Sequence, residues 1–191
     1  VYKKNPDIGV IIMEVKRNFN PKKNFLKKIK NFCTKNKIVL IFDECTSGFR
    51  ETFGGLHKKY GVYPDMAIFS KALGNGYSIS AVIGIQEVMK ATESTFISST
   101  FWTERIGPSA ALKTLEVMEE INSWNYITNM GKKIGDRWKI LADRYNLPIN
   151  ISEINPVFEK STHNFIDLSE FDEFDKLDAD LAHALMSINA V

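Results

Sequence analysis

Four short apolar runs in the first half of the chain limit its fold more than any other feature. They cover residues 8–15, 38–42, 66–69 and 79–85, and each is rich in Ile and Val or apolar almost throughout, without alternating in polarity. That pattern is typical of strands that are buried on both faces of a sheet. We therefore expect these four segments to be strands of one sheet.

A helical pattern separates the first two apolar runs. Phe25, Ile29, Phe32 and Cys33 recur at helical spacing within residues 21–36, and Pro21 suits the first turn of a helix. A strand, a helix and a strand within residues 8–42 form a βαβ unit, which requires parallel strands. We expect an α/β fold with a mostly parallel open sheet.

The second half of the chain changes to long helical patterns. We expect helices over residues 108–124 and 126–146, the second of which ends before Pro148 because proline cannot continue a helix. A possible strand over residues 149–154 precedes an acidic stretch over residues 170–180. The change of pattern predicts a large domain over residues 1–125, followed over residues 126–191 by a connecting helix and a partial small domain.

The charge of the chain gives no reason to expect a nucleic acid partner. The 25 Lys and Arg residues nearly balance the 23 Asp and Glu residues. Residues 1–60 carry 14 basic against five acidic side chains, but lysine pairs such as Lys22–Lys23 and Lys27–Lys28 fit the solvated face of one helix. No Arg-rich or base-stacking pattern accompanies them.

Cysteine and apolar content predict a cytoplasmic protein without metal or membrane. Cys33 and Cys45 form neither a disulfide framework nor a metal-ligand spacing. No apolar run reaches the roughly 18 residues that span a bilayer, and no signal segment opens the chain. Because the chain starts at Val1 and reaches its first strand by Ile8, we expect it to be a piece of a longer protein.

The candidate chemical groups follow the apolar runs directly. Glu14 ends the first run, Asp43 and Glu44 follow the second, and Lys71 follows the third. Ligands bind outside the carboxyl ends of the strands in an open parallel sheet, so these side chains are expected to converge. Asp43 alone could equally be a turn or capping residue, and Lys71 alone could be a surface lysine. A shielded lysine amine, in contrast, is a nucleophile for Schiff-base formation.

Three longer stretches resemble a known family. Residues 41–55 (IFDECTSGFRETFGG), 64–84 (PDMAIFSKALGNGYSISAVIG) and 99–118 (STFWTERIGPSAALKTLEVM) are similar to the class-III aminotransferases of pyridoxal 5'-phosphate (PLP) fold type I. Within that group the chain most resembles glutamate-1-semialdehyde aminomutase-like enzymes. The match covers roughly residues 8–145 in consistent order and spacing.

The resemblance implies roles for individual residues. Lys71 would form the Schiff base with PLP and then move a proton at the substrate, while Asp43 would keep the pyridinium nitrogen protonated. Cys45 replaces the usual valine behind the ring, and a thiol is small and apolar enough for that position. Thr100 would bind the cofactor phosphate of the partner subunit in a homodimer with shared active sites, with Thr103 as a rival.

Other family positions are less direct. Glu14 and Arg50 match positions that we interpret as architectural, and Val15 stands where proline is common. The segment after Thr100 reads Phe-Trp-Thr-Glu-Arg in place of the short Ser-Gly-Asn form, which resembles a subset of these enzymes found with sugar or polyol pathways. The phosphate-binding loop of the family would precede Val1, and helix-terminal amides of that kind contribute much of the affinity for an anion.

Three hypotheses follow. The first is a PLP-dependent aminotransferase or aminomutase acting on small amino, aldehyde or keto substrates. The second is a non-catalytic or truncated aminotransferase-like subunit that cannot bind PLP alone. The third is a receiver-like signalling module, which the long helices after Pro108 disfavour. The histidines, His57, His163 and His183, are scattered without ligand spacing, and we expect surface or core positions for them.

Overall fold

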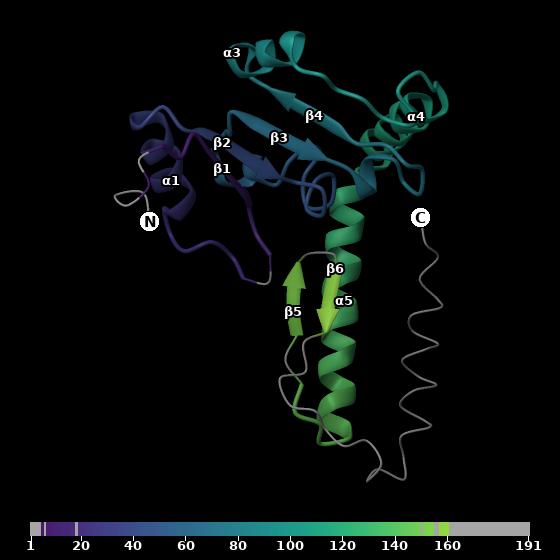
Figure 1. Cartoon of the computed structure of the whole chain (residues 1–191). Helices are drawn as coiled ribbons and strands as arrows, with labels where there is room; N and C mark the ends of the chain where they lie inside the picture. Colours follow the sequence, from purple (N-terminus) through teal and green to yellow (C-terminus); the bar gives the residue numbers. More distant parts are fainter. Residues whose placement is uncertain (1–4, 6, 18, 150, 155–156, 161–191) are drawn as a thin grey trace. The chain divides into compact units, whose positions relative to one another are not determined.

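A four-stranded sheet organises the part of the chain that the computed structural model describes, which comprises residues 5, 7–17, 19–149, 151–154 and 157–160. The strands are β1 (Val10–Glu14), β2 (Val39–Asp43), β3 (Met66–Phe69) and β4 (Ala81–Gly84), and they lie side by side in the order β1-β2-β3-β4 (Figure 1). The first three strands are parallel and β4 is antiparallel to β3. The α/β fold with a mostly parallel sheet is thus confirmed.

The antiparallel β4 follows from the length of its connection. Only residues 70–80 separate β3 from β4, and they include the 3-10 helix η2 (Lys71–Leu73) and a turn around Gly74. A parallel crossover needs a dozen or more residues and usually a helix. The chain therefore returns beside β3 in the opposite direction, with Phe69 paired to Ala81.

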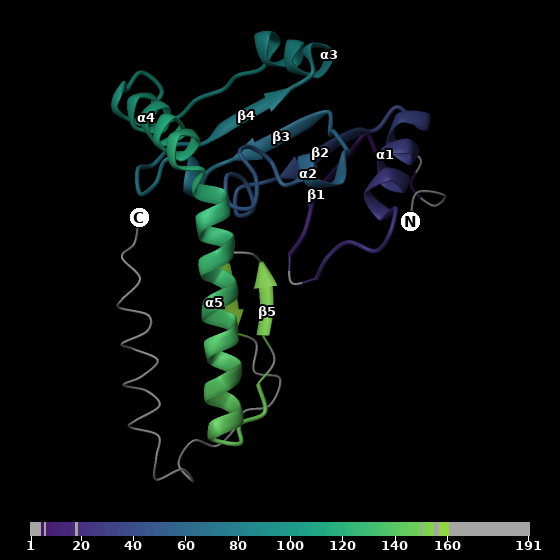
Figure 2. The same ribbon diagram turned by 180° about the vertical axis from the view of Figure 1, so that it is seen from behind.

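One face of the sheet packs against helices. Leu40 and Phe42 of β2 are fully buried against α1 (Phe25–Lys35) and α2 (His57–Tyr60). Figure 2 shows these two helices and the sheet from behind. A second cluster joins β3 to α4 (Ile106–Ile121) through Phe69, Leu73 and Ala111. Phe42 is the register partner of Ala67, a member of the second cluster, so both clusters lie on the same face.

The opposite face differs from the sequence expectation. The side chains of β2 alternate between half-buried and buried, and the outward Val10 and Ile12 of β1 and Val82 of β4 are about half exposed. Continuous apolar runs predict burial on both faces. Within the described residues only one face is covered by helices.

The first helix begins later than Pro21. Asn24 adopts a left-handed backbone conformation (φ 62°) and α1 starts at Phe25. A left-handed residue cannot continue a right-handed helix, so Pro21 lies before this turn and outside the helix. The apolar stripe is confirmed in part: Cys33 is buried and Ile29 and Phe32 pack against the first cluster, whereas Phe25 is exposed and its neighbour Leu26 is buried.

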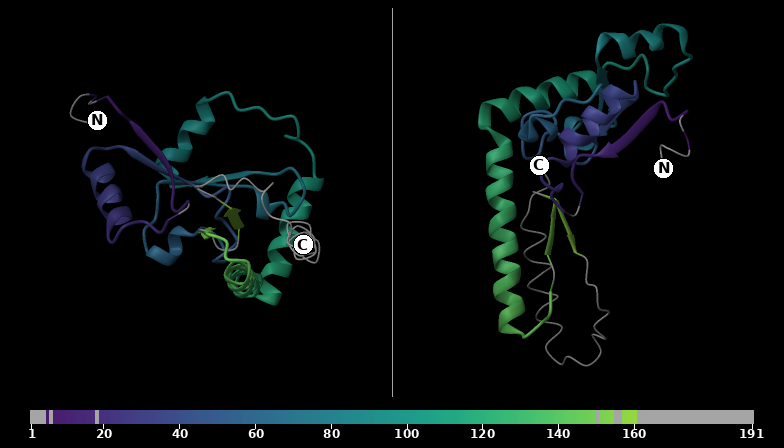
Figure 3. Two further views of the ribbon diagram at one scale, coloured as in Figure 1. Left: turned by 90° about the horizontal axis from the view of Figure 1, so that it is seen from below. Right: turned by 90° about the vertical axis from the view of Figure 1, so that its left-hand side faces the viewer.

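Long helices follow the sheet, as the sequence predicts. After α3 (Gln86–Met89) and the 3-10 helix η3 (Lys90–Ser94), α4 is joined at Asn122 to α5 (Ser123–Arg144). Asn122 has a left-handed conformation (φ 50°), and the chain changes direction there (Figure 3). None of the described helices is long and apolar enough to cross a membrane.

A two-stranded antiparallel sheet follows α5. It consists of β5 (Ile151–Ile154) and β6 (Val157–Lys160), and β5 lies within the strand expected over residues 149–154. The acidic stretch over residues 170–180 lies outside the described residues. The division into domains at residues 125 and 126 stays a prediction.

Candidate active site

Three parallel strands end together and bring their following residues to one edge of the sheet. Glu14 is the register partner of Asp43, and Asp43 is in turn the partner of Ile68 in β3. Lys71 comes three residues after Ile68, at the start of η2. The strand ends therefore hold Glu14, Asp43 and Lys71 at the same carboxyl edge, as the sequence predicts.

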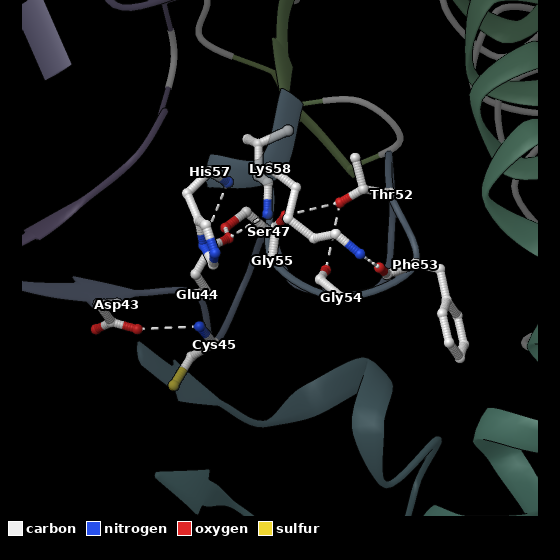
Figure 4. A network of polar contacts seen from close by, with 11 residues as sticks. Asp43, Glu44, Cys45, Ser47, Thr52, Phe53, Gly54, Gly55, His57 and Lys58 are labelled. Carbon is white, nitrogen blue, oxygen red and sulfur yellow. Dashed lines mark hydrogen bonds and ion pairs between the residues drawn. The ribbon is translucent and has the colours of Figure 1, made fainter. Parts of the chain in front are cut away.

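Asp43 forms a tight turn at the end of β2. Its Oδ1 accepts a hydrogen bond of 3.0 Å from the backbone N–H of Cys45 (Figure 4). The turn role considered from sequence is thus real. Oδ2 accepts no hydrogen bond within the described part of the chain, so a half-buried carboxylate oxygen is left to bind another donor.

Lys71 is held by a side-chain contact and by a strained backbone. Its Nζ donates a hydrogen bond of 2.6 Å to Oγ1 of Thr46, and its backbone lies in the left-handed region with φ 43°. Such a conformation costs a non-glycine residue of order 1–3 kcal/mol, and strain of this kind concentrates at functional sites. The lysine side chain is exposed, so its amine is accessible.

The thiol of Cys45 reports that these groups are close to one another. Burial raises the pKa of Cys45 most, the hydrogen bond with Asp43 and its negative charge raise it further, the charge of Lys71 lowers it, and Glu14 raises it slightly. The contacts agree, because Asp43 accepts from the backbone of Cys45 and the Lys71 amine donates to Thr46, the next residue along the chain. The structure thus brings Asp43, Cys45 and Lys71 together, with Glu14 beside them.

The other predicted residues are placed less centrally. Thr100 and Thr103 lie in an exposed turn before α4, and no hydrogen bond joins either side chain to the carboxyl-edge residues in the described structure. Glu14 accepts a hydrogen bond of 2.7 Å from Arg17. Arg50 donates from Nε to the carbonyl oxygen of Thr46 at 2.7 Å, and burial lowers the pKa of its guanidinium. A supporting function for Arg50 agrees with its interpretation as architectural.

Glu44 departs from the sequence expectation, because its carboxylate belongs to a buried cluster that the sequence did not predict. Its side chain is fully buried. Its oxygens accept hydrogen bonds from the hydroxyl of Ser47, from the backbone N–H of Leu56 at 2.9 Å and of His57 at 3.0 Å, and from Nδ1 of His57 at 2.8 Å (Figure 4). An ionised carboxylate only accepts hydrogen bonds, so Nδ1 carries the proton.

These hydrogen bonds determine the charge of Glu44. Burial alone would raise the pKa of the carboxyl, but the bonds from the His57 ring, Ser47 and the two backbone amides outweigh it and lower the pKa. The result is an ionised carboxylate in the interior, compensated by donors. It ties the end of β2 to the segment that enters α2.

A glycine pattern was the one sequence signal for this cluster. A Cβ at Gly55 would collide with the His57 ring and lie 2.9 Å from Oε1 of Glu44, so only glycine allows the segment to approach. Gly54 and Gly55 precede His57 with one residue, Leu56, between them, but Glu44 and His57 are thirteen positions apart. His57 is buried, so it takes the core position, one of the two positions expected for it.

The residues of this edge fit a pyridoxal cofactor. A free carboxylate oxygen on Asp43 is an acceptor for a protonated ring nitrogen, and an accessible amine on Lys71 is a nucleophile for an aldehyde, which are the two groups that such a ring requires. No group of three or more His, Cys, Asp or Glu side chains within the described residues has the arrangement of a metal site.

Solved structures with this fold include proteins that hold PLP. The PLP internal aldimine form of the Sphingopyxis sp. MTA144 FumI protein superposes with a TM-score of 0.75 at 21% identity, covering 80% of this chain and 38% of that chain. At this identity the likeness establishes the fold alone.

Sequence relatives then define the family. The aminotransferase class-III family matches residues 5–154. The chain is 35% identical over 133 residues to a 3-aminobutyryl-CoA aminotransferase of Cloacimonas acidaminovorans (strain Evry), covering 69% of this chain and 32% of that protein. It is 31% identical over 159 residues to a glutamate-1-semialdehyde 2,1-aminomutase of Bdellovibrio bacteriovorus (strain ATCC 15356 / DSM 50701 / NCIMB 9529 / HD100), covering 80% and 37%.

The chain therefore belongs to the class-III aminotransferase family, as its sequence motifs predict. It spans about a third of the length of these two relatives. This membership replaces the receiver-like interpretation. The residue roles at the carboxyl edge stay predictions, and they are developed below.

Proposed function

We propose that this chain supplies the cofactor lysine and the ring-nitrogen carboxylate of a PLP-dependent aminotransferase. The observation that carries the proposal is the meeting of Lys71 and Asp43 around Cys45 at the carboxyl edge of the sheet. A lysine alone could be a surface residue, and an aspartate alone could be a turn or capping residue. Their convergence in a chain of the class-III aminotransferase family gives both residues one purpose.

Each residue has a distinct task in this proposal. When bound, PLP supplies an electron sink for the bonds at the substrate α-carbon. Lys71 holds the aldehyde carbon of the cofactor through its amine and later moves a proton at the substrate carbon. The free oxygen of Asp43 holds the proton on the ring nitrogen. The thiol of Cys45 packs against the ring, and Thr100 contacts the phosphate of the partner subunit in a homodimer.

The substrate class follows from the chemistry and from the relatives. We infer a small amino compound as donor and an aldehyde or keto compound as acceptor; the names of the two relatives contain an amino group and a semialdehyde group, respectively. Glutamate-1-semialdehyde aminomutase-like chemistry is the favoured form, because the motifs resemble that group and a relative carries that name.

The near-visible absorption of lysine-bound PLP tests the proposal. The complete protein incubated with PLP should show this band, and Lys71→Ala should abolish it. Lys58→Ala is the control, because Lys58 is another exposed lysine and its Nζ donates to the carbonyl of Phe53. A band that persists in Lys71→Ala would reject the lysine assignment, and no band in the wild type would favour the non-catalytic subunit.

Asp43→Asn tests the second group separately. An amide cannot hold the ring nitrogen in its cationic form, so transamination should fall by at least about a hundredfold while the absorption band persists. Activity within threefold of the wild type would contradict the role of Asp43.

A further inference from the structure

The hydroxyl of Thr46 is a feature of the carboxyl edge to which neither the motifs nor the family match gives a role. Its Oγ1 accepts the hydrogen bond of 2.6 Å from Nζ of Lys71, and this is the one side-chain contact that the described structure gives the lysine amine. Thr46 is half-buried, whereas Lys71 is exposed. Thr46, the less exposed of the two residues, therefore determines where the long side chain of Lys71 lies.

The backbone of Thr46 is itself held on two sides. Its carbonyl oxygen accepts the hydrogen bond from Nε of Arg50 at 2.7 Å. Thr46 itself follows the Asp43–Cys45 turn and precedes Ser47, whose hydroxyl donates a hydrogen bond to buried Glu44. The hydroxyl of Thr46 thus projects from a segment that is fixed at both ends.

The position of the lysine needs such a contact. Lysine loses up to about 2 kcal/mol of rotamer entropy when its side chain is fixed, and an exposed lysine has no packing to fix it. A charge-assisted hydrogen bond to a rigid hydroxyl can offset part of that loss. Orientation of the reacting groups also accelerates a condensation strongly.

We propose that Thr46 is a positioning residue, whose hydroxyl holds the Lys71 amine beside Asp43 before the cofactor arrives. This proposal rests on the function proposed above, because it assumes that Lys71 condenses with PLP. Arg50 supports Thr46 through the hydrogen bond that it donates to the Thr46 carbonyl oxygen. The nitrogen of Lys71 must leave the Thr46 hydroxyl to form its bond with the aldehyde carbon, and water is released in that condensation.

Two amine reagents with opposite requirements test the proposal on the complete protein. Any free amine attacks trace acetic anhydride, and a hydrogen bond that the amine donates slows this reaction, whereas condensation with PLP requires the amine to lie at one place. Thr46→Val removes the hydroxyl and keeps the shape. We expect it to raise acetylation of Lys71, relative to Lys58 in the same molecule, by about three- to tenfold, and to slow PLP condensation by a similar factor.

Matched variants separate this role from a structural one. Thr46→Ser keeps a hydroxyl and should restore both rates to within about twofold of the wild type. Thr34→Val makes the same chemical change on the exposed face of α1 and should alter neither rate. If Thr46→Val does not fold, Thr46→Ala, which adds no bulk, replaces it in both assays.

The outcomes distinguish the two proposals. Unchanged acetylation and unchanged condensation in Thr46→Val would overturn the positioning role, as would a failure of Thr46→Ser to restore the rates. If the wild type forms no PLP bond at Lys71 but Thr46→Val still raises acetylation, the hydrogen bond is confirmed and the proposed function fails.

Discussion

Substitution of Glu44 by Gln tests whether the buried carboxylate organises the carboxyl edge. The amide replaces one carboxylate oxygen by an NH2 group, which donates and cannot accept. Each oxygen of Glu44 receives two hydrogen bonds: Oε1 from the amide and ring of His57, and Oε2 from Ser47 and Leu56. Whichever way the amide is oriented, two donors lose their acceptor.

The expected loss of stability is large. A buried donor left without a partner costs about 1–3 kcal/mol, and Glu44→Gln leaves two donors in that state. We therefore expect Glu44→Gln to lower the free energy of unfolding by about 3 kcal/mol at pH 7. The urea midpoint should fall accordingly, with the slope of the transition unchanged.

The same carboxylate makes the effect depend on pH. The pKa of Glu44 in the folded protein lies below its ordinary value of 4.5. A lowered pKa contributes stability that is present above the unfolded value and is lost as the pH falls through the folded value. The difference between wild type and Glu44→Gln should therefore shrink below about pH 4.5.

Urea titrations from pH 3 to pH 7 measure this difference, with Glu116→Gln as control. Glu116 forms an ion pair of 3.0 Å with Lys113 on an exposed surface, where both side chains are about two-thirds exposed or more. Such a pair contributes at most about 1 kcal/mol. If Glu44→Gln is no more destabilising than Glu116→Gln at pH 7, or if its effect does not change with pH, the reasoning is refuted.

Three other predictions concern Glu51 and Cys45, in the same region. Glu51 is nearly buried and joins buried Lys16 at 3.2 Å to Lys59 at 2.6 Å; Glu51→Gln should cost about 3 kcal/mol in urea unfolding because Lys16 is left buried beside a neutral amide, and a cost below 1 kcal/mol would contradict this. Burial, and after it Asp43, raises the pKa of Cys45. Alkylation of its thiol by iodoacetamide, followed by mass spectrometry, should therefore be slower at pH 8 than alkylation of free cysteine, and a fast-reacting Cys45 would show that the thiol is not shielded. Cys45→Val should leave the free energy of unfolding within about 1 kcal/mol of the wild type.

The sheet was predictable because each of its strands corresponds to one continuous apolar run in the sequence. The apolar runs predicted the four strands, and the helical spacing from Phe25 through Ile29 to Cys33 predicted α1. The predicted start of α1 at Pro21 was wrong, because Asn24 has a left-handed backbone conformation and the helix can begin only after it. Burial on one face only could not be predicted, because apolar composition does not state which side chains find a covering helix.

The candidate site was predictable where its residues follow strands. Asp43 and Lys71 were found because the carboxyl ends of parallel strands converge. The Glu44–His57 cluster was not found, because its partners are thirteen residues apart and the contact depends on the path of the intervening glycine segment. The contact between Thr46 and Lys71 likewise joins residues 25 positions apart and depends on a strained backbone at Lys71.

Identification of the lysine that binds PLP tests the central claim most directly. The complete protein is incubated with PLP, reduced with borohydride to make the bond permanent, digested, and analysed by mass spectrometry. The account predicts one dominant pyridoxyl-lysine, in the peptide that contains Lys71. Modification spread over the exposed lysines of α1, with Lys71 no more modified than Lys27 or Lys28, would contradict it.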